Sequence, residues 1–435
     1  MDRKKNFINS FLVLFSSNIL QLIFGVITSI IIARYLNPEK LGLKTVLSNF
    51  PSLFVTFFEM GTRQSTIYFV GQKKYQASDL FSNILSLWLF TSILGLVLYF
   101  IVAHFEFQNI SIILLIVSAS YIPIKIGHSF LSGLLLGKEL IRKLATFNIA
   151  NAILTPFLTI LFLMVFDDGV LGVLLAAQLV ALYTLFVRIF LLCGDLNLKF
   201  VLSFRVGIIK DILWHGIYYA IALFVMTNFT LIPIYLMTGK LSTYEIGIYS
   251  VGSAFALLLK QVISSTFPVL FAKGANAADA KEFSRNVHKM LRISIIILIL
   301  LMGLLYWGVE FILPLVYGNS YFESVKVTQI LLLGVFAYVL QYILIMDMAG
   351  KGKPQITIKA MIVPFLLCII LNYIAIDKWG NVGAAYSTSF SMFLCCISYL
   401  VVYSKEMGFS IREMLAPRYS DWVDLSIRIK SLIKK

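Results

Sequence analysis

The chain alternates long apolar runs with short polar loops along most of its length. A helix of about 20 apolar residues crosses the hydrocarbon core of a bilayer. Most of the apolar runs are at least that long, which favours membrane-spanning helices over the shorter helices of a soluble core. The pattern predicts about twelve such helices, near residues 9–33, 42–62, 80–103, 111–136, 144–166, 170–193, 214–238, 244–271, 292–316, 325–349, 356–376 and 381–403.

Composition supports this class and narrows the chemistry. Hydrophobic residues make up 60% of the chain and charged residues 13%, and the mean hydropathy is +0.91. Because a soluble domain carries about 25% charged residues, a water-facing fold is excluded. The four cysteines lie inside apolar runs without metal-site spacing, so we expect small core residues and no cofactor. They are Cys193, Cys368, Cys395 and Cys396.

The basic residues fix an orientation. The chain has 36 Lys and Arg and a net charge of +15, and most of these cations fall in alternate loops between the predicted helices. Under the positive-inside rule, both termini are expected in the cytoplasm. Nucleic acid is not an expected partner, since the cations lie between apolar runs and form no patch with interleaved aromatic residues.

The two halves of the chain resemble each other at an offset of roughly 200 to 210 residues. Three landmarks recur six helices later and in the same order, which predicts two six-helix lobes with a cavity between them. Chance similarity among apolar helices is the alternative. The paired landmarks are 34–43 with 235–248, Thr155-Pro-Phe-Leu with Val363-Pro-Phe-Leu, and Gly169-Val-Leu-Gly with Gly380-Asn-Val-Gly.

This repeat divides the chain into four parts. Residues 1–195 form an N-terminal lobe, 196–213 a cytoplasmic amphipathic linker, and 214–403 a C-terminal lobe. In the tail, 404–435, Trp422, Leu425, Ile429 and Leu432 share one helical face. A helix on the anionic inner leaflet is one interpretation of this pattern, and a solvated tail is the other.

Charges at membrane depth usually face a cavity, and one lysine in each lobe has this position. Lys125 has Tyr121 on its helical face, and Lys260 has Ser253 on its face. We expect both lysines to line the central cavity and bind an anion there, since lysine binds phosphate as a point charge that also permits release. The alternative is a lysine that pairs with a carboxylate or extends to the interface.

Further polar residues are candidates for the same path. Glu59 and Arg63 end a polar stripe along the second helix, with Arg63 either attracting an anion or anchoring the helix at the interface. Asn228 adds polarity to the seventh helix. Gly25 and Pro233 are candidate hinges, the alternative being that their helices form the seam between the lobes. Arg34 is a candidate gating residue through a contact with Glu39, and the alternative is interfacial anchoring. Glu310 and Asp347 suggest structural pairs or a coupling role.

The segments 31–42, 317–324, 330–334 and 371–385 resemble those of the polysaccharide transporters of the MATE-like (MOP) exporter superfamily, which includes Wzx-type O-antigen flippases. The resemblance covers nearly the whole chain. It implies a monomeric, V-shaped pair of lobes that moves a polyprenyl-diphosphate-linked oligosaccharide, an O-antigen, capsule or exopolysaccharide unit, to the outer leaflet by alternating access. It also implies the polysaccharide polymerase and chain-length machinery as partners.

Two other functions compete with this interpretation. A cation-coupled multidrug exporter of the same superfamily is expected to carry an acidic residue deep in its first or seventh helix, and neither predicted helix has one. A membrane glycosyltransferase or polymerase is expected to carry a large polar loop, and the predicted outer loops are short. Because no nucleotide-binding or hydrolase motif occurs in the sequence, we expect a transporter and not an enzyme.

Overall fold

The computed structural model describes residues 2–166, 169–195, 198–264 and 280–416, and every regular element in these ranges is helical. The N-terminal half contains α1 (Asp2–Tyr35), α2 (Pro38–Phe58), α3 (Thr62–Gly71), α4 (Ala77–Glu106), α5 (Ile112–Ala119), α6 (Tyr121–Gly137), α7 (Ile141–Val165) and α8 (Val170–Asp195). The C-terminal half contains α9 (Val206–Asn228), α10 (Ile232–Met237), α11 (Thr243–Ser264), α13 (Ala280–Tyr317), η1 (Asn319–Tyr321), α14 (Ser324–Gly350), α15 (Pro354–Met407) and α16 (Ile411–Leu415).

A multi-span helical membrane protein is confirmed, while the count of twelve spans stays a prediction. Ten helices in the described ranges are long and apolar enough to cross a membrane. One of them, α15, has 54 residues and is interrupted at Gly380, whose φ of 57° and ψ of −139° are not helical. This kink divides α15 into two arms that correspond to the last two predicted spans. The predicted eighth span corresponds to α11, which is not among the ten.

Local sequence explains where α2 begins and ends. The side chain of Asn37 accepts a hydrogen bond from the backbone N–H of Lys40 at 2.8 Å. Pro38 occupies the first turn, where a backbone N–H would have no acceptor within the helix, so its absence costs nothing. At the other end, Met60 and Gly61 adopt left-handed φ values of 49° and 65°. The chain therefore changes direction before continuing as α3.

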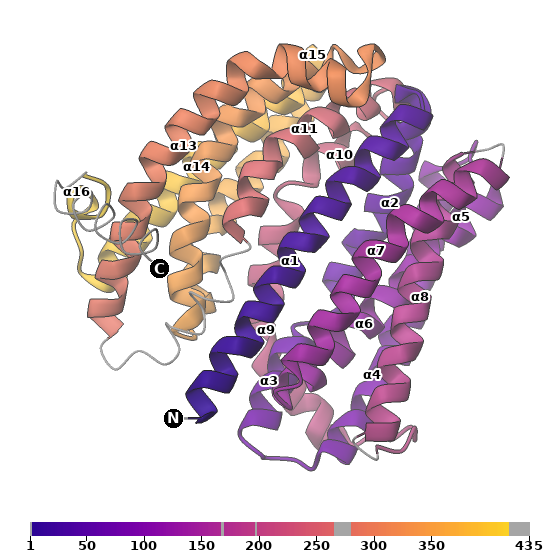
Figure 1. Cartoon of the computed structure of the whole chain (residues 1–435), viewed down its shortest axis with the longest axis vertical. Coiled ribbons are helices and arrows are strands. Elements are labelled where there is room, and N and C mark those ends of the chain that lie inside the picture. Colours follow the sequence, from indigo (N-terminus) through magenta and orange to yellow (C-terminus); the bar gives the residue numbers. More distant parts are fainter. Residues whose placement is uncertain (1, 167–168, 196–197, 265–279, 417–435) are drawn as a thin grey trace.

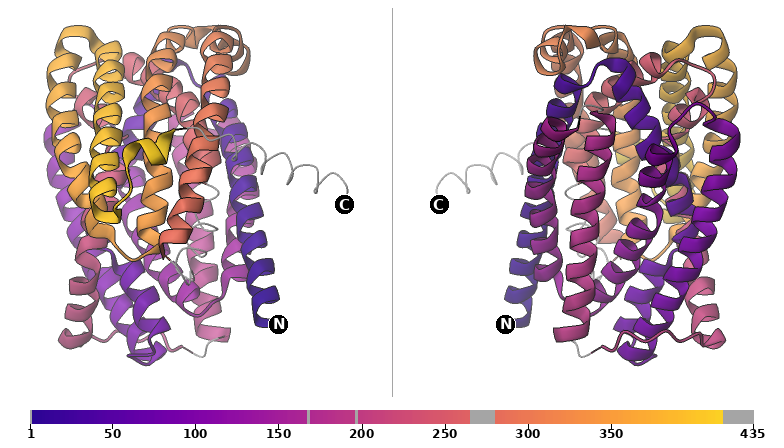
Figure 2. Two further views of the ribbon diagram at one scale, coloured as in Figure 1. Left: turned by 90° about the vertical axis from the view of Figure 1, so that its left-hand side faces the viewer. Right: turned by 90° about the vertical axis from the view of Figure 1, so that its right-hand side faces the viewer.

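The helices form two groups that meet at one end of the molecule. In Figure 1, α1, α7 and α8 lie on one side and α13 and α14 on the other. The groups converge where α2 begins and α15 bends, and they spread apart toward the end that carries the N-terminus. The side views in Figure 2 show the long helices running roughly parallel to one another. We call the end where the groups converge the closed end, and predict that it faces the outside.

The landmarks of the sequence repeat have matching positions in the two halves. A Cβ atom on Gly172 of α8 would clash with the carbonyl of Phe162 in α7, and one on Gly383 would clash with the carbonyl of Ala375 in the other arm of α15. Two consecutive helices therefore pack at backbone distance at the same point of each half. The prolines of the other landmark, at positions 156 and 364, are both buried within helices.

The predicted linker is only partly outside helices. Residues 198–205 have no regular structure, and α9 begins at Val206, eight residues before the predicted start at 214. Arg205 fixes this point, because its guanidinium pairs with Asp79 at 2.9 Å and its backbone N–H donates to Asn83 at 2.6 Å. In the tail, α16 is described, whereas the predicted apolar face, including Trp422, lies outside the described residues.

Candidate functional site

A cavity of about 620 Å³ lies between the two halves of the chain. Its walls come from α1, α2, α6 and α7 on one side and from α10, α11, α13 and the turn before α10 on the other. The lining residues are Gln21, Gly25, Thr28, Ser29, Ile32, Ala33, Leu41, Lys44, Thr45, Asn49, Lys125, Asn151, Ala152, Thr155, Thr230, Leu231, Ile234, Ser250, Val251, Ser253, Ala254, Leu257 and Tyr317. Two of the predicted substrate-binding residues, Lys125 and Ser253, thus meet in one cavity from opposite lobes.

The cavity carries positive charge. Lys44 of α2 and Lys125 of α6 are the charged residues among the described residues that line it. Lys125 has its ammonium 5.4 Å from the centre of the Tyr121 ring, a cation–π distance. Within the described part of the chain neither lysine forms an ion pair or a hydrogen bond. Because both lysines are half-buried and face the cavity without an ionic partner in the described residues, they favour an anion there.

The rest of the lining is polar but mostly neutral. Eleven lining residues carry a hydroxyl or amide group, and some of these groups already bond to the protein. Ser29 and Tyr317, which come from opposite lobes, form a hydrogen bond of 3.1 Å, and the Gln21 amide donates to the Asn148 carbonyl at 3.3 Å. Hydroxyl and amide groups both donate and accept, as the hydroxyls of a sugar do.

Lys260 lies outside the set of described residues that line the cavity. Its ammonium is 4.8 Å from the ring centre of Tyr338 and 5.5 Å from that of Tyr342, within the C-terminal lobe. The two rings provide a cation–π environment for the charge. In this conformation Lys125 is among the described residues that line the cavity and Lys260 is not, and the binding of an anion by either lysine stays a prediction.

At the closed end, α2 and α11 touch backbone to backbone. A Cβ atom on Gly42 would overlap the Thr243 carbonyl, and one on Gly247 would overlap the Pro38 carbonyl. Gly42 and Gly247 occupy equivalent positions of the first repeat landmark. Since the contact leaves no space for any side chain at these two positions, it closes the cavity at this end of the molecule.

Two polar contacts reinforce the closed end. Arg34 of α1 donates through its Nε to the carbonyl of Val316 at 2.8 Å and through a terminal nitrogen to the carbonyl of Leu315. It thus caps the C-terminal end of α13 in the other lobe, where free carbonyls attract a cation. The hydroxyl of Tyr321 donates to the Leu36 carbonyl at 2.7 Å. Arg34 therefore contacts the other lobe at the closed end, and the gating role expected for it stays a prediction.

α9 forms a seam along α2 and α3. Asn228 of α9 donates to the hydroxyl of Thr56 in α2 at 3.1 Å. This residue, predicted to line the cavity, therefore lies in the seam and contacts the other lobe. Residues 229–231 interrupt the helix between α9 and α10, shortly before Pro233, and a hinge at this proline stays a prediction. The other predicted hinge, Gly25, lines the cavity inside an uninterrupted α1.

Glu59 and Arg63 lie on either side of the break between α2 and α3 and not in the cavity lining. The Glu59 carboxylate accepts a hydrogen bond from Ser129 of α6, which fixes the end of α2 within the N-terminal lobe. His128 on the same helix bonds to the Ala181 carbonyl at 2.8 Å. Among the described residues, no group of three His, Cys, Asp or Glu is placed to hold a metal ion.

Comparison with known proteins identifies the family. A family model described as "Polysaccharide biosynthesis protein" matches residues 7–271, more than half of the chain. The chain belongs to the polysaccharide biosynthesis protein family. The resemblance found in the sequence is thereby confirmed.

Several named relatives of this family member are known. It is 30% identical to a proposed O-antigen transporter of Shigella flexneri over 166 residues, which span 37% of this chain and 38% of that relative. It is 23% identical to the capsular polysaccharide biosynthesis protein CapF of Staphylococcus aureus over 410 residues, or 92% and 99% of the two chains. The first relative is described as a transporter, as expected for this chain.

Solved structures show the fold of this family member. The lipid II flippase MurJ in an inward closed conformation matches with a TM-score of 0.73 at 16% identity, over 92% of this chain and 89% of that one. An inward-facing multidrug resistance MATE family transporter of the MOP superfamily matches with a TM-score of 0.60 at 14% identity, over 92% and 98%. The MOP-like fold predicted from the sequence is confirmed.

Two charged residues of this family member were missed in the sequence. Lys44 directly precedes Thr45, where the polar stripe of the second helix begins, and its place near a helix end resembles that of an interfacial anchor. Arg188 of α8 is only 6% exposed, and it donates to the Ser132 hydroxyl at 2.6 Å and to the His128 carbonyl at 3.2 Å. Its position inside an apolar run is the signal that was available.

Proposed function

We propose that this protein is a flippase that moves a polyprenyl-diphosphate-linked oligosaccharide from the cytoplasmic to the outer leaflet. The observation that carries the proposal is the cavity between the lobes, which is lined by Lys44 and Lys125 and by no acidic residue among the described lining residues. A diphosphate must exchange its hydration shell for fixed cations on its way through an apolar layer. Lys44 and Lys125, which form no ion pair or hydrogen bond in the described part of the chain, supply that charge.

The neutral part of the lining supports a glycan next to the diphosphate. The eleven hydroxyl and amide residues offer donors and acceptors without a second ionic group. The relatives are consistent with this substrate class, since the names of two of them refer to O-antigen or capsular polysaccharide and that of the structural neighbour to lipid II.

The contacts at the closed end support transport by alternating access. The contact of Gly42 with α11 and the Arg34 cap on α13 close the cavity on one side. For the substrate to leave there, these contacts must separate while the opposite ends of the lobes approach each other. We infer that the described conformation is inward-facing, with both termini in the cytoplasm of a bacterial inner-membrane protein that acts as a monomer.

The multidrug exporter is the competing function within the superfamily. A cationic drug requires a negative charge or an aromatic cage, and the described lining has Lys44 and Lys125 as its charges and Tyr317 as its aromatic residue. The lining therefore favours an anionic substrate over a cationic one.

The test is a flipping assay with the full-length protein in liposomes. The substrate is a defined oligosaccharide on a polyprenyl diphosphate, and the matched control is the same oligosaccharide on an uncharged lipid of equal length. We expect the protein to accelerate only the diphosphate-linked form. Flipping no faster than in protein-free liposomes, or equal acceleration of both lipids, would reject the proposal.

A further inference from the structure

A second pocket, of about 510 Å³, lies at the closed end between α1 and α13. Arg34 of α1 lines it from the N-terminal lobe. Glu310, Phe311 and Leu315 of α13 line it from the C-terminal lobe, together with Asn319 in the short helix that follows. This pocket is separate from the central cavity, because the two share no residue among their described linings.

The Arg34 guanidinium has donors left for a ligand. Its Nε and one terminal nitrogen, Nη2, donate to the carbonyls of Val316 and Leu315. The other terminal nitrogen, Nη1, forms no hydrogen bond within the described part of the chain. The edge of the guanidinium between Nη1 and Nη2 therefore keeps free N–H groups. Two parallel N–H groups on one edge match two oxygens of a phosphate.

Glu310 places a negative charge in the same pocket. Its Oε1 accepts a hydrogen bond from the amide of Gln329 at 3.4 Å, whereas its Oε2 has no hydrogen-bond partner among the described residues. Arg34 and Glu310 form no ion pair with each other, although both line this pocket. Two opposite charges that share a pocket without pairing fit a ligand that carries both charges itself.

An exposed apolar stripe on α13 leads into the pocket. Its members lie on one face at helical spacing, and each is at least 67% exposed: Leu300, Leu304, Trp307, Phe311 and Leu315. The last two also line the pocket. Of the ten candidate membrane spans in the described ranges, α13 is the least buried. The stripe therefore faces the acyl chains of the bilayer.

Trp307 indicates the depth of the pocket in the membrane. Tryptophan is enriched at the boundary between hydrocarbon and water. Trp307 lies one helical turn before Glu310, on the side away from the closed end. The charges of the pocket thus lie at the level of the lipid head groups, while the stripe lies in the hydrocarbon.

We propose that this pocket binds the head group of a phospholipid that carries a phosphate and a primary ammonium group, as phosphatidylethanolamine does. The phosphate binds the free edge of Arg34, the ammonium donates to Oε2 of Glu310, and an acyl chain follows the stripe on α13. Phosphatidylglycerol has no cation for Glu310. The quaternary ammonium of phosphatidylcholine has no N–H to donate.

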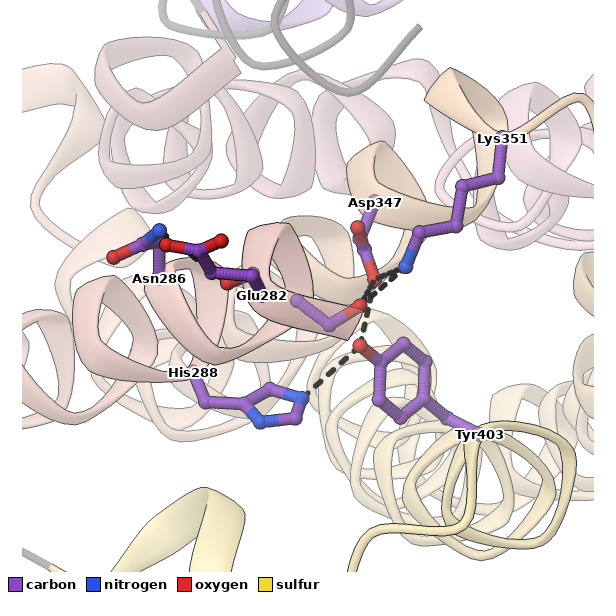
Figure 3. Close-up of polar contacts among 7 residues, drawn as sticks. Glu282, Asn286, His288, Asp347, Lys351 and Tyr403 are labelled. Carbon is purple, nitrogen blue, oxygen red and sulfur yellow. Dashed lines mark hydrogen bonds and ion pairs between the residues drawn. The ribbon is translucent and has the colours of Figure 1, made fainter. Parts of the chain in front are cut away.

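A lipid in this pocket would link the two lobes. Arg34 belongs to the N-terminal lobe and Glu310 to the C-terminal lobe. The other end of α13 is fixed within its own lobe, where His288 lies 3.0 Å from the Tyr403 hydroxyl, which donates to Asp347 of α14 (Figure 3). A lipid held by both charges therefore strengthens the closed end. This effect goes beyond the proposed function and requires only that the lobes separate there.

The first experiment measures lipid binding to the full-length protein in detergent by native mass spectrometry. Phosphatidylethanolamine, phosphatidylglycerol and phosphatidylcholine with identical acyl chains are compared. We expect phosphatidylethanolamine to bind about fivefold more tightly than the other two, the effect of one exposed ion pair of about 1 kcal/mol. Equal affinity for the three lipids would overturn the proposal.

Two variants locate the site. Glu310→Gln should remove the preference for phosphatidylethanolamine, and Arg34→Gln should weaken all three lipids, because each carries a phosphate. The controls are Glu106→Gln and Arg142→Gln, which remove an exposed charge at the end of α4 and on α7. Both controls should bind lipids as the wild type does. A preference that survives in Glu310→Gln would overturn the site.

A soluble competitor distinguishes a lipid from a free zwitterion. Glycerophosphoethanolamine carries the same charged groups without acyl chains. At the concentration of the lipid it should not displace phosphatidylethanolamine. If it did, the apolar stripe would contribute nothing, and the assignment to a lipid would be wrong.

The second experiment tests the link between the lobes. Ser29→Cys, in a protein whose native cysteines are replaced, is labelled with a water-soluble maleimide in liposomes that contain phosphatidylethanolamine or phosphatidylcholine. Labelling from outside should be slower with phosphatidylethanolamine, by up to about fivefold. Glu310→Gln should abolish the difference and Glu106→Gln should keep it. Equal rates in the two liposomes would overturn the link. Neither experiment contains the glycan, so failure of the flipping assay alone would reject the proposed function and leave the lipid site standing.

Discussion

The two lobes differ in the contacts that their charged side chains make inside the membrane-spanning region. The N-terminal lobe presents Lys44 and Lys125 to the cavity without an ion pair or hydrogen bond in the described residues, and the Lys125 ammonium lies 5.4 Å from the centre of the Tyr121 ring. The C-terminal lobe compensates its charges internally, with Asp347 paired to Lys351 and with Lys260 close to two tyrosine rings. A charge that is compensated within its own lobe stabilises that lobe, whereas a cation that faces the cavity without an ionic partner is available to an ion that enters the cavity.

The largest expected effect comes from removing the unpaired charges. Lys44→Ala combined with Lys125→Ala should lower the flipping rate by at least about 100-fold, because each hydrogen bond to a charged group contributes about 1.5–3 kcal/mol. The flipping assay with the diphosphate-linked glycan measures this loss. Arg285→Ala, which removes an exposed cation of the other lobe, is the control for net charge. Transport at the wild-type rate in the double variant would show that the cavity lysines do not carry the substrate.

The closed end provides the next test, because it joins the lobes through equivalent residues. Gly247→Ala should force α11 away from the Pro38 carbonyl, at about 1–3 kcal/mol for overpacking. A cysteine at Ser29 in the cavity should then react about tenfold faster with a water-soluble maleimide added from outside. Gly303→Ala is the control, since nothing lies within 4 Å of a Cβ atom there. An unchanged labelling rate would mean that the cavity does not open at this end.

The fold was largely predictable from the sequence, because a bilayer imposes a simple rule on length and polarity. Apolar runs of about 20 residues located the helices, and the repeat paired Gly42 with Gly247 before any contact was known. The break between α9 and α10 lies close to Pro233, a candidate hinge in the sequence. The apolar pattern did not predict where each helix begins or ends. α9, for example, begins at Val206, in a segment that is not uniformly apolar.

The site was less predictable, because depth in the membrane does not specify which way a residue faces. Lys125 and Lys260 have similar depth and similar polar neighbours in sequence, yet only Lys125 faces the cavity. The difference arises from the contacts of Lys260 with Tyr338 and Tyr342 on α14, which follow it by 78 and 82 residues in the sequence. Lys44 was missed because a lysine near a helix end suggests an interfacial anchor. Its position in the cavity depends on the other lobe, which the sequence pattern of its own helix does not describe.

A smaller effect is expected at the cap on α13. Arg34→Gln removes the charge that the carbonyls of Leu315 and Val316 attract, a contribution of about 0.3–1 kcal/mol for an exposed helix terminus. The labelling rate at Ser29 should rise by no more than about fivefold, and Arg34→Lys should restore part of the closure. A larger increase than that of Gly247→Ala would make Arg34, and not the glycine contact, the main determinant of the closed end.

The smallest effect is expected at Lys260, and it sharpens the contrast between the lobes. Lys260→Met keeps the length of the side chain but removes the cation–π contacts with Tyr338 and Tyr342, so unfolding in detergent should become easier by about 0.5–2 kcal/mol. Lys260→Arg should retain most of this stability. The flipping rate should stay within about twofold of wild type, because the ammonium is outside the cavity lining. If Lys260→Met instead lost transport without losing stability, Lys260 would enter the path in a conformation other than this one, and the C-terminal lobe would contribute a substrate-binding charge after all.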